Sequence, residues 1–82
     1  MFKAKINVTL KESVLDPQGK AILNAFHSLG FIETQDVRAG KYFEVLINSV
    51  DRNQAEQKIR QGCEKLLVNP VIEKYSFELE EK

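Results

Sequence analysis

The residues best suited to chemistry in this chain are its single histidine, His27, and its single cysteine, Cys63. A catalytic histidine needs an orienting partner, and a nucleophilic cysteine needs a setting that lowers its pKa. No partner stands at a spacing that indicates a triad or a zinc site. We expect His27 on the polar side of a helix and Cys63 buried as a small hydrophobic residue. The sequence therefore predicts no catalytic, metal-binding or cofactor-binding residue on this chain.

Anion binding is a second possible chemistry, because Lys11, Arg38 and Lys41 lie at expected strand ends and turns. Scattered cations are common on any surface, so exposure without a ligand is the simpler interpretation. The four glycines form neither a dinucleotide-binding nor a P-loop pattern, which argues against a nucleotide cradle. The aromatic residues of the expected strands lack the signature of an RNA-recognition module, so we expect them to pack in a core.

The first half of the chain predicts a strand, a helix and a second strand. Alternating apolar and polar side chains indicate a strand over residues 2–10. Asp16 followed by proline is typical of a helix start, and the helix should run to about residue 29 and stop at Gly30. Residues 31–38 alternate less clearly and predict a strand with a bulge or bend. The apolar stripe expected on the helix consists of Ile22, Phe26 and Leu29.

The second half predicts a strand, a helix and a last strand. After a turn at residues 39–40, residues 42–48 should form a strand with one apolar and one partly polar side. Asp51 with Gln54 resembles a capping box at the start of a helix that ends before Pro70. Residues 71–79 predict the last strand, and residues 80–82 a solvated tail. The expected apolar face of this helix consists of Ala55, Ile59, Gly62, Cys63 and Leu66, with the glycine allowing a close approach to the sheet or to a neighbour.

The order of these elements, βαββαβ, predicts an α+β, ferredoxin-like fold. Two helices would then cover one face of a four-stranded, mainly antiparallel sheet. A chain of 82 residues is one domain, residues 1–82, and its core is marginal alone, so we expect oligomers.

The amino-acid composition argues against two classes of partner. Twelve Lys and Arg balance twelve Asp and Glu, so neither a nucleic acid nor an acidic membrane is an expected partner. One cysteine cannot form an internal disulfide, and the N-terminal residues show no continuous apolar stretch typical of a signal peptide or a spanning helix. These features predict a cytoplasmic protein.

Three segments carry a family pattern: VTLKESVLDPQG at residues 8–19, DVRAGK at 36–41 and CEKLLVNPVIE at 63–73. Together they resemble the PurS subunit of phosphoribosylformylglycinamidine synthase, also called formylglycinamide ribonucleotide amidotransferase. The resemblance follows nearly the whole chain in the same order. Residues 48–61 depart from it and match only as a capped, polar helix.

The resemblance implies a small non-catalytic subunit in purine biosynthesis. In that reaction formylglycinamide ribonucleotide becomes formylglycinamidine ribonucleotide, with glutamine and ATP consumed. The implied partners are a synthetase (PurL-type) subunit, which uses ATP and magnesium, and a glutaminase (PurQ-type) subunit, which releases ammonia. The resemblance also implies homodimers or tetramers with strand pairing between subunits. We expect this chain to assemble the two enzymes and to support ammonia transfer.

The expected interface residues lie in loops or at element ends of the matched segments. Four have local roles in starting a helix, allowing a turn or ending a helix, namely Asp16, Pro17, Gly40 and Pro70. Arg38 and Lys41 have no such local role in the sequence and are the first choices for contact with a partner. The full set is Lys11, Glu12, Asp16, Pro17, Arg38, Gly40, Lys41, Asn69 and Pro70.

Two other functions fit the expected fold. A small-ligand-binding regulatory domain of βαββαβ type would bind an amino acid or a nucleotide at a dimer interface, and Arg38 and Lys41 beside a turn motivate it. An RNA-binding module is the third hypothesis, and the neutral net charge argues against it.

Overall fold

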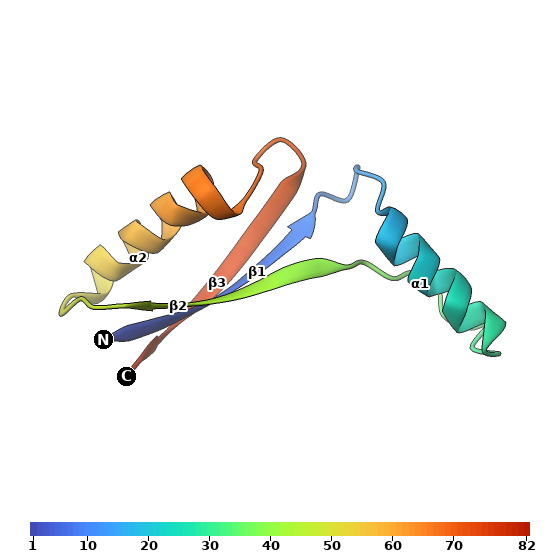
Figure 1. The fold of residues 1–82 in the computed structure, drawn as a ribbon, viewed down its shortest axis with the longest axis horizontal. Helices are drawn as coiled ribbons and strands as arrows, with labels where there is room; N and C mark the ends of the chain where they lie inside the picture. Colours follow the sequence, from blue (N-terminus) through green and yellow to red (C-terminus); the bar gives the residue numbers. More distant parts are fainter.

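The computed structural model describes all 82 residues as a three-stranded sheet with one helix packed on it and a second helix that projects away from it (Figure 1). Strand β1 lies in the middle and pairs antiparallel with β2 on one side and with β3 on the other. Strands β2 and β3 therefore run in the same direction, and α2 connects them across one face of the sheet. The elements are β1 (Phe2–Leu10), α1 (Pro17–Ser28), β2 (Gly40–Ile47), α2 (Arg52–Gly62), a π-helical segment (Cys63–Leu67) and β3 (Glu73–Glu81).

The α+β class and the antiparallel sheet are confirmed, but the ferredoxin-like order of four strands is wrong. Residues 31–38 form turns and irregular backbone instead of a strand. Their apolar residues Ile32 and Val37 stand at opposite parities, which we interpreted as a bulge, whereas the segment pairs with no strand. The expected turn at residues 39–40 is also wrong, because Gly40 is the first residue of β2.

The core lies between α2 and one face of the sheet. Its central side chains, Ile6, Val8 and Cys63, are fully buried. The alternation of β1 places its even-numbered residues on this face, as the sequence predicts. The last strand is shifted from the expected range, and Glu80 and Glu81 belong to it instead of to a tail. The core residues are Phe2, Ala4, Ile6, Val8, Ala55, Ile59, Cys63, Val68 and Leu79.

The apolar face of α2 is confirmed only up to Cys63. The helix continues as a π-helical turn in which Val68 N–H donates to the Cys63 carbonyl at 2.9 Å. This turn holds one more residue than an α-helical turn, so the side chains after Cys63 are rotated about the helix axis. Leu67 packs against the core, whereas Leu66 is 82% exposed, contrary to prediction. The expected close approach to the sheet at Gly62 is also wrong, since nothing lies within 4 Å of the position that a Cβ would occupy, and a close approach to a neighbour stays a prediction.

Helix α1 does not cover the sheet, which is the largest departure from the expected fold. It lies beyond the end of β1, far from α2 and from both chain termini (Figure 1). The molecule is consequently elongated, with extents of 50 × 27 × 14 Å and a radius of gyration of 16.2 Å, where a compact chain of this length has about 12 Å. We call residues 12–39, which contain α1 and the return to β2, the arm. No helix is both long enough and apolar enough to span a membrane.

The core position of Ile59 gives a test of the fold. Ile59 is 5% exposed beneath α2, so Ile59→Ala should lower the free energy of unfolding by about 2–5 kcal/mol in urea denaturation at a fixed protein concentration. Val50→Ala is the matched control, because Val50 is fully exposed and its truncation should change stability by less than about 0.5 kcal/mol. Equal losses in the two variants would contradict the packing of α2 on the sheet.

Candidate assembly surfaces

The carboxylate of Asp16 binds both ends of the arm and so fixes the arm at the end of the sheet. Asp16 Oδ1 accepts from Gly19 N–H at 2.9 Å and so caps α1, while Asp16 Oδ2 accepts from Ala39 N–H at 2.8 Å. Asp16 is 5% exposed, and these bonds, first that from Gly19, lower the pKa of its carboxyl group. The predicted capping roles of Asp16 and Pro17 are confirmed, and the bond to Ala39 adds a link across the arm that the sequence did not predict.

Arg38 strengthens the same junction. Its Nη2 donates to the carbonyls of Lys11 and Val14 at 3.0 and 3.1 Å. The backbones also approach closely, since a Cβ on Gly19 would overlap the Val37 carbonyl oxygen and a Cβ on Gly40 would lie 2.5 Å from the Val8 oxygen. Gly40 is therefore needed for close approach and not for a turn. We call this junction, where residues 11–19 meet residues 37–40, the neck.

The remaining expected interface residues lie at the same end of the sheet, and three of them, Glu12, Lys41 and Asn69, contact the first two residues of β3. Lys41 Nζ lies 3.4 Å from Glu73, and Glu73 also accepts from Asn69 N–H at 2.7 Å, the bond that contributes most to lowering the pKa of Glu73. Glu12 lies 3.4 Å from Lys74. Pro70 follows in the loop after α2, where Asn69 Oδ1 accepts from Val71 N–H.

These contacts correct one premise of the sequence analysis. Arg38 and Lys41 do have local roles, Arg38 in the neck and Lys41 in an ion pair with Glu73. Their contact with a partner stays a prediction. A hollow of about 340 Å³ beside Arg38 is lined by both signs of charge, which does not favour a phosphate over any other ligand. Its residues are Thr9, Leu10, Glu12, Asp36, Arg38 and Lys74.

The two residues best suited to chemistry lie where we expected them. His27 is exposed on α1, and its Nε2 lies 2.8 Å from the Thr34 carbonyl oxygen within the arm. Cys63 is fully buried, and this burial raises the pKa of its thiol, which makes it less reactive. No group of His, Cys, Asp and Glu side chains is arranged to hold a metal ion.

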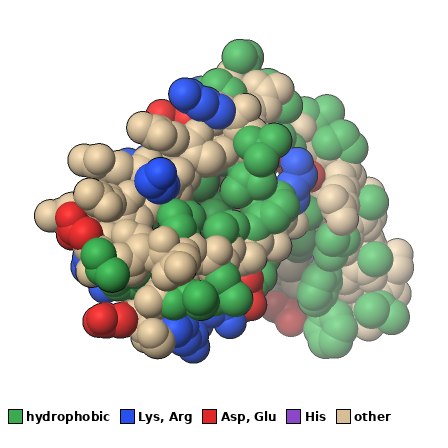
Figure 2. Space-filling model, turned by 60° about the vertical axis from the view of Figure 1, so that its left-hand side comes forward, with side chains coloured by type: hydrophobic (Ala, Val, Ile, Leu, Met, Phe, Trp, Pro, Cys, Tyr) green, Lys and Arg blue, Asp and Glu red, His purple; other side chains and the backbone are tan.

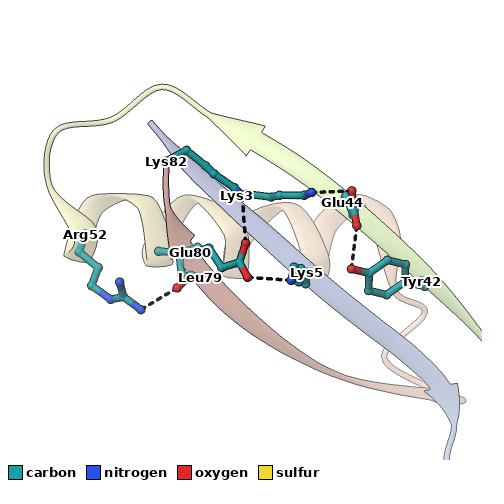
Figure 3. A network of polar contacts seen from close by, with 8 residues as sticks. All are labelled: Lys3, Lys5, Tyr42, Glu44, Arg52, Leu79, Glu80 and Lys82. Atoms are coloured by element: carbon teal, nitrogen blue, oxygen red, sulfur yellow. Dashed lines mark hydrogen bonds and ion pairs between the residues drawn. The ribbon is translucent and has the colours of Figure 1, made fainter.

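The face of the sheet opposite α2 is polar and neutralises its own charges (Figure 3). Lys3 pairs with Glu44 at 3.0 Å and Lys5 with Glu80 at 2.7 Å, each across neighbouring strands. The partner lysine holds the pKa of each glutamate below its usual range, and the hydrogen bond to Glu80 raises the pKa of Lys5. Tyr42 donates to Glu44 at 2.9 Å. A surface of paired charges offers little attraction for a polyanion.

The face that carries α2 is only partly covered. Helix α2 lies toward β3, with Arg52 Nη2 donating to the Leu79 carbonyl at 2.9 Å and the Arg60 guanidinium 5.3 Å from the centre of the Phe77 ring. The strip over β2 beside α2 is open and apolar, and we call it the lane. Figure 2 shows hydrophobic side chains gathered in a hollow of the nearer part of the molecule and again on the more distant part. The lane contains a groove of about 240 Å³ lined by Ile6, Val45, Leu46, Ile47, Lys58, Ile59, Gly62, Leu66 and Leu67.

The lane was not predicted from the sequence. One signal for it was present, because Gly62 is a glycine within a helix that has no conformational need for one. Leu46 does not mark the lane, since it stands at the opposite parity to Val45 and Ile47, on the side of β2 that carries Glu44. The signal of Gly62 becomes interpretable only when α1 is known to lie away from the sheet.

Comparisons with known proteins agree with the resemblance over the whole chain. The family model described as PurS, phosphoribosylformylglycinamidine (FGAM) synthase, matches residues 3–81. The PurS subunit of Bacillus subtilis is 53% identical over 81 residues, which are 99% of this chain and 95% of that protein. A crystal structure of Bacillus subtilis PurS matches with a TM-score of 0.88 over 99% of this chain and 100% of that chain.

Two further structures extend the match to more distant relatives. PurS of Methanocaldococcus jannaschii, one of the subunits of formylglycinamide ribonucleotide amidotransferase in the purine biosynthetic pathway, is 32% identical with a TM-score of 0.89, covering 100% of this chain and 99% of that chain. A chain in the structure of PurLQS from Thermotoga maritima is 29% identical with a TM-score of 0.88, covering 96% of each chain.

These matches place the three strands and two helices in the PurS-like fold class. The chain belongs to the PurS family and is a subunit of phosphoribosylformylglycinamidine synthase, a ligase of purine biosynthesis.

The double role of Asp16 can be tested with Asp16→Asn. The amide keeps an oxygen for Gly19 N–H but places an NH₂ group near Ala39 N–H, so the variant should have a lower Tm by circular dichroism. A carboxyl group with a lowered folded-state pKa stabilises the fold above its unfolded pKa of about 3.9, and the stabilisation is lost as the pH falls through the folded pKa. The Tm difference from the wild type should be constant between pH 7 and about pH 5 and shrink below about pH 4.

Asp51→Asn is the matched control for this experiment. Asp51 caps α2 through one hydrogen bond, from Asn53 N–H at 3.0 Å, and an asparagine can replace that bond. The control should therefore change Tm less than Asp16→Asn at pH 7. Equal effects of the two substitutions would contradict the bridging role of Asp16.

Proposed function

We propose that this subunit carries no catalytic group and holds the synthetase and glutaminase subunits of phosphoribosylformylglycinamidine synthase together. The observation that carries the proposal is the arm, whose helix has exposed apolar side chains and, apart from contacts within the arm such as Phe26 with Phe31, does not pack on the sheet. Phe26 and Leu29 on α1 are 38% and 75% exposed. An isolated helix of 12 residues is marginally stable in water, so α1 needs a second surface to pack on.

Assembly has a direct chemical benefit in this reaction. The ammonia released by a glutaminase must reach the synthetase before it escapes or becomes ammonium, which is not a nucleophile. A subunit that docks one active site against the other keeps the path short and closed to water. The relative in the PurLQS structure supports the partners that we propose, a PurL-type synthetase and a PurQ-type glutaminase. ATP and magnesium would be bound by the synthetase and not by this chain.

The chain would work as a homodimer or a tetramer. Its accessible surface is 6022 Å², whereas a compact monomer of 9.4 kDa exposes about 5,000 Å². The excess is similar to the roughly 800 Å² that each partner buries in a standard interface. Strand pairing between copies stays a prediction, and the outer edges of β2 and β3 are free for it. The unpaired, buried Cys63 supports a reducing compartment such as the cytoplasm.

Reconstitution of the enzyme from its separate subunits tests the proposal. With all three subunits, synthesis should proceed from glutamine, and omission of this chain should abolish that activity while leaving ammonia-dependent synthesis by the synthetase much less affected. The Val50→Ala chain should restore the glutamine-dependent rate as well as the wild type does, because Val50 is exposed outside the arm and the core. Equal use of glutamine with and without the chain would refute the proposal.

A further inference from the structure

We infer that the last turn of α2 is a two-register switch, in which Leu66 and Leu67 exchange places beside the core and the contact between Asn69 and Glu73 is the latch. In the observed π-register Leu67 packs on the core and Leu66 is 82% exposed. In the α-register the turn is one residue shorter, and Leu66 takes the place of Leu67. The switch goes beyond the proposed function, because it is argued from contacts within this chain.

The first argument is that the turn contains an extra residue without the usual reason. A hydrogen bond that spans five residues is common where a helix ends in a residue with positive φ. Val68 N–H donates such a bond to the Cys63 carbonyl at 2.9 Å, yet Val68 has extended backbone with φ −125° and ψ 135°, and the only positive φ in the chain is at Gly30. A π-helical turn is rare, whereas the α-helical turn is the ordinary one. Contacts outside the helix must therefore hold the π-register.

The second argument is that the loop after α2 supplies these contacts. Asn69 N–H donates to Glu73 Oε1 at 2.7 Å, and the Asn69 carbonyl accepts from Glu73 N–H at 2.7 Å. The loop is also fixed to the sheet, since Lys11 N–H donates to the Ile72 carbonyl at 2.8 Å. With Asn69 held at the start of β3, the chain from Cys63 to Asn69 is one residue longer than an α-helical turn needs. The turn accommodates that residue by becoming π-helical.

The third argument is that the two registers bury similar side chains. Leu66 and Leu67 are both leucines, so their exchange changes little apolar area. Leu67 moves in turn to the site of Val68, which is 7% exposed, and needs space for one more methylene there. The spacing of α2 favours the α-register, because an uninterrupted α-helix places Leu66 on the same face as Ile59 and Cys63. The latch is therefore the main difference that favours the π-register.

The switch connects two surfaces of the subunit. Leu66 and Leu67 line the groove of the lane, so the register sets the shape of that groove. The latch lies at the end of the sheet that carries the neck, where the Glu73 carboxylate is also 3.4 Å from Lys41 Nζ. A lysine or arginine of a neighbouring subunit that binds Glu73 in place of Asn69 would release the latch and change the groove. This consequence rests on the proposed function, which supplies the neighbouring subunit.

Nuclear magnetic resonance of the full-length protein tests the switch. Glu73→Ala removes the side-chain acceptor of the latch and should raise the population of the α-register about tenfold or more. Relaxation dispersion of the backbone amides between Cys63 and Glu73 measures that population. The scalar coupling across the hydrogen bond to the Cys63 carbonyl should appear at Leu67 N–H in the α-register and at Val68 N–H in the π-register.

Glu78→Ala is the matched control for Glu73→Ala. Glu78 is an exposed glutamate of the same strand and lies outside the latch, so its truncation should leave the populations at wild-type values. The absence of exchange in Glu73→Ala, or equal exchange in the two variants, would overturn the inference.

A pair of single-residue deletions tests the extra residue without touching the latch. Deletion of Lys65 removes one residue from the π-helical turn and leaves an α-helical turn. Deletion of Gln57 is the control, because it rotates Ala55 by about 100° away from the side of the helix that faces the core. In circular dichroism the first deletion should lower Tm much less than the second. Equal losses of Tm would contradict the inference.

These results separate the inference from the proposed function. If the turn has a single register, exchange is absent from Glu73→Ala while the reconstituted enzyme still needs this chain to use glutamine. If the chain is dispensable for glutamine use, the proposed function fails while the exchange between registers remains.

Discussion

The bridge made by the Asp16 carboxylate is the interaction on which the shape of this subunit depends. One oxygen caps α1 and the other binds the backbone 23 residues further along the chain. A buried backbone N–H must find an acceptor, and this carboxylate supplies one to each end of the arm. Arg38 holds the carbonyls of the same junction from the other side. The arm is consequently fixed to the end of the sheet, and its helix cannot cover the apolar face that a two-layer fold would normally bury.

The rest of the structure accommodates this constraint. The core between the sheet and α2 has only nine buried residues in a chain of 82, which is a small core for an independent domain. On the polar face of the sheet, ion pairs between neighbouring strands neutralise the charges, so this face can remain exposed to solvent. The apolar surface left over is divided between α1 and the lane over β2. A subunit with that surface gains stability when other chains pack on it, which suits a protein that works within a larger enzyme.

The sequence predicted the elements whose signals are local. The strand at residues 2–10 follows from strict alternation, and the starts of both helices follow from the capping of Asp16 and Asp51. The family resemblance supplied the function that composition alone could not give. The errors come from interactions that join distant residues or change a helical period. The direction of the arm depends on the bond between Asp16 and Ala39, and the exposure of Leu66 depends on one extra residue in a helical turn. Neither the bond between Asp16 and Ala39 nor the extra residue in the helical turn can be predicted from the spacing of apolar residues.

Amide hydrogen exchange across a dilution series tests most directly whether α1 depends on a second chain. The account predicts that the α1 amides, residues 21–28, exchange slowly when the protein is associated and lose that protection when dilution separates the copies. The amides of the central strand β1 should stay protected throughout, because both of its edges are paired within one chain. Slow exchange of α1 in the separated monomer, equal to that of β1, would contradict the account.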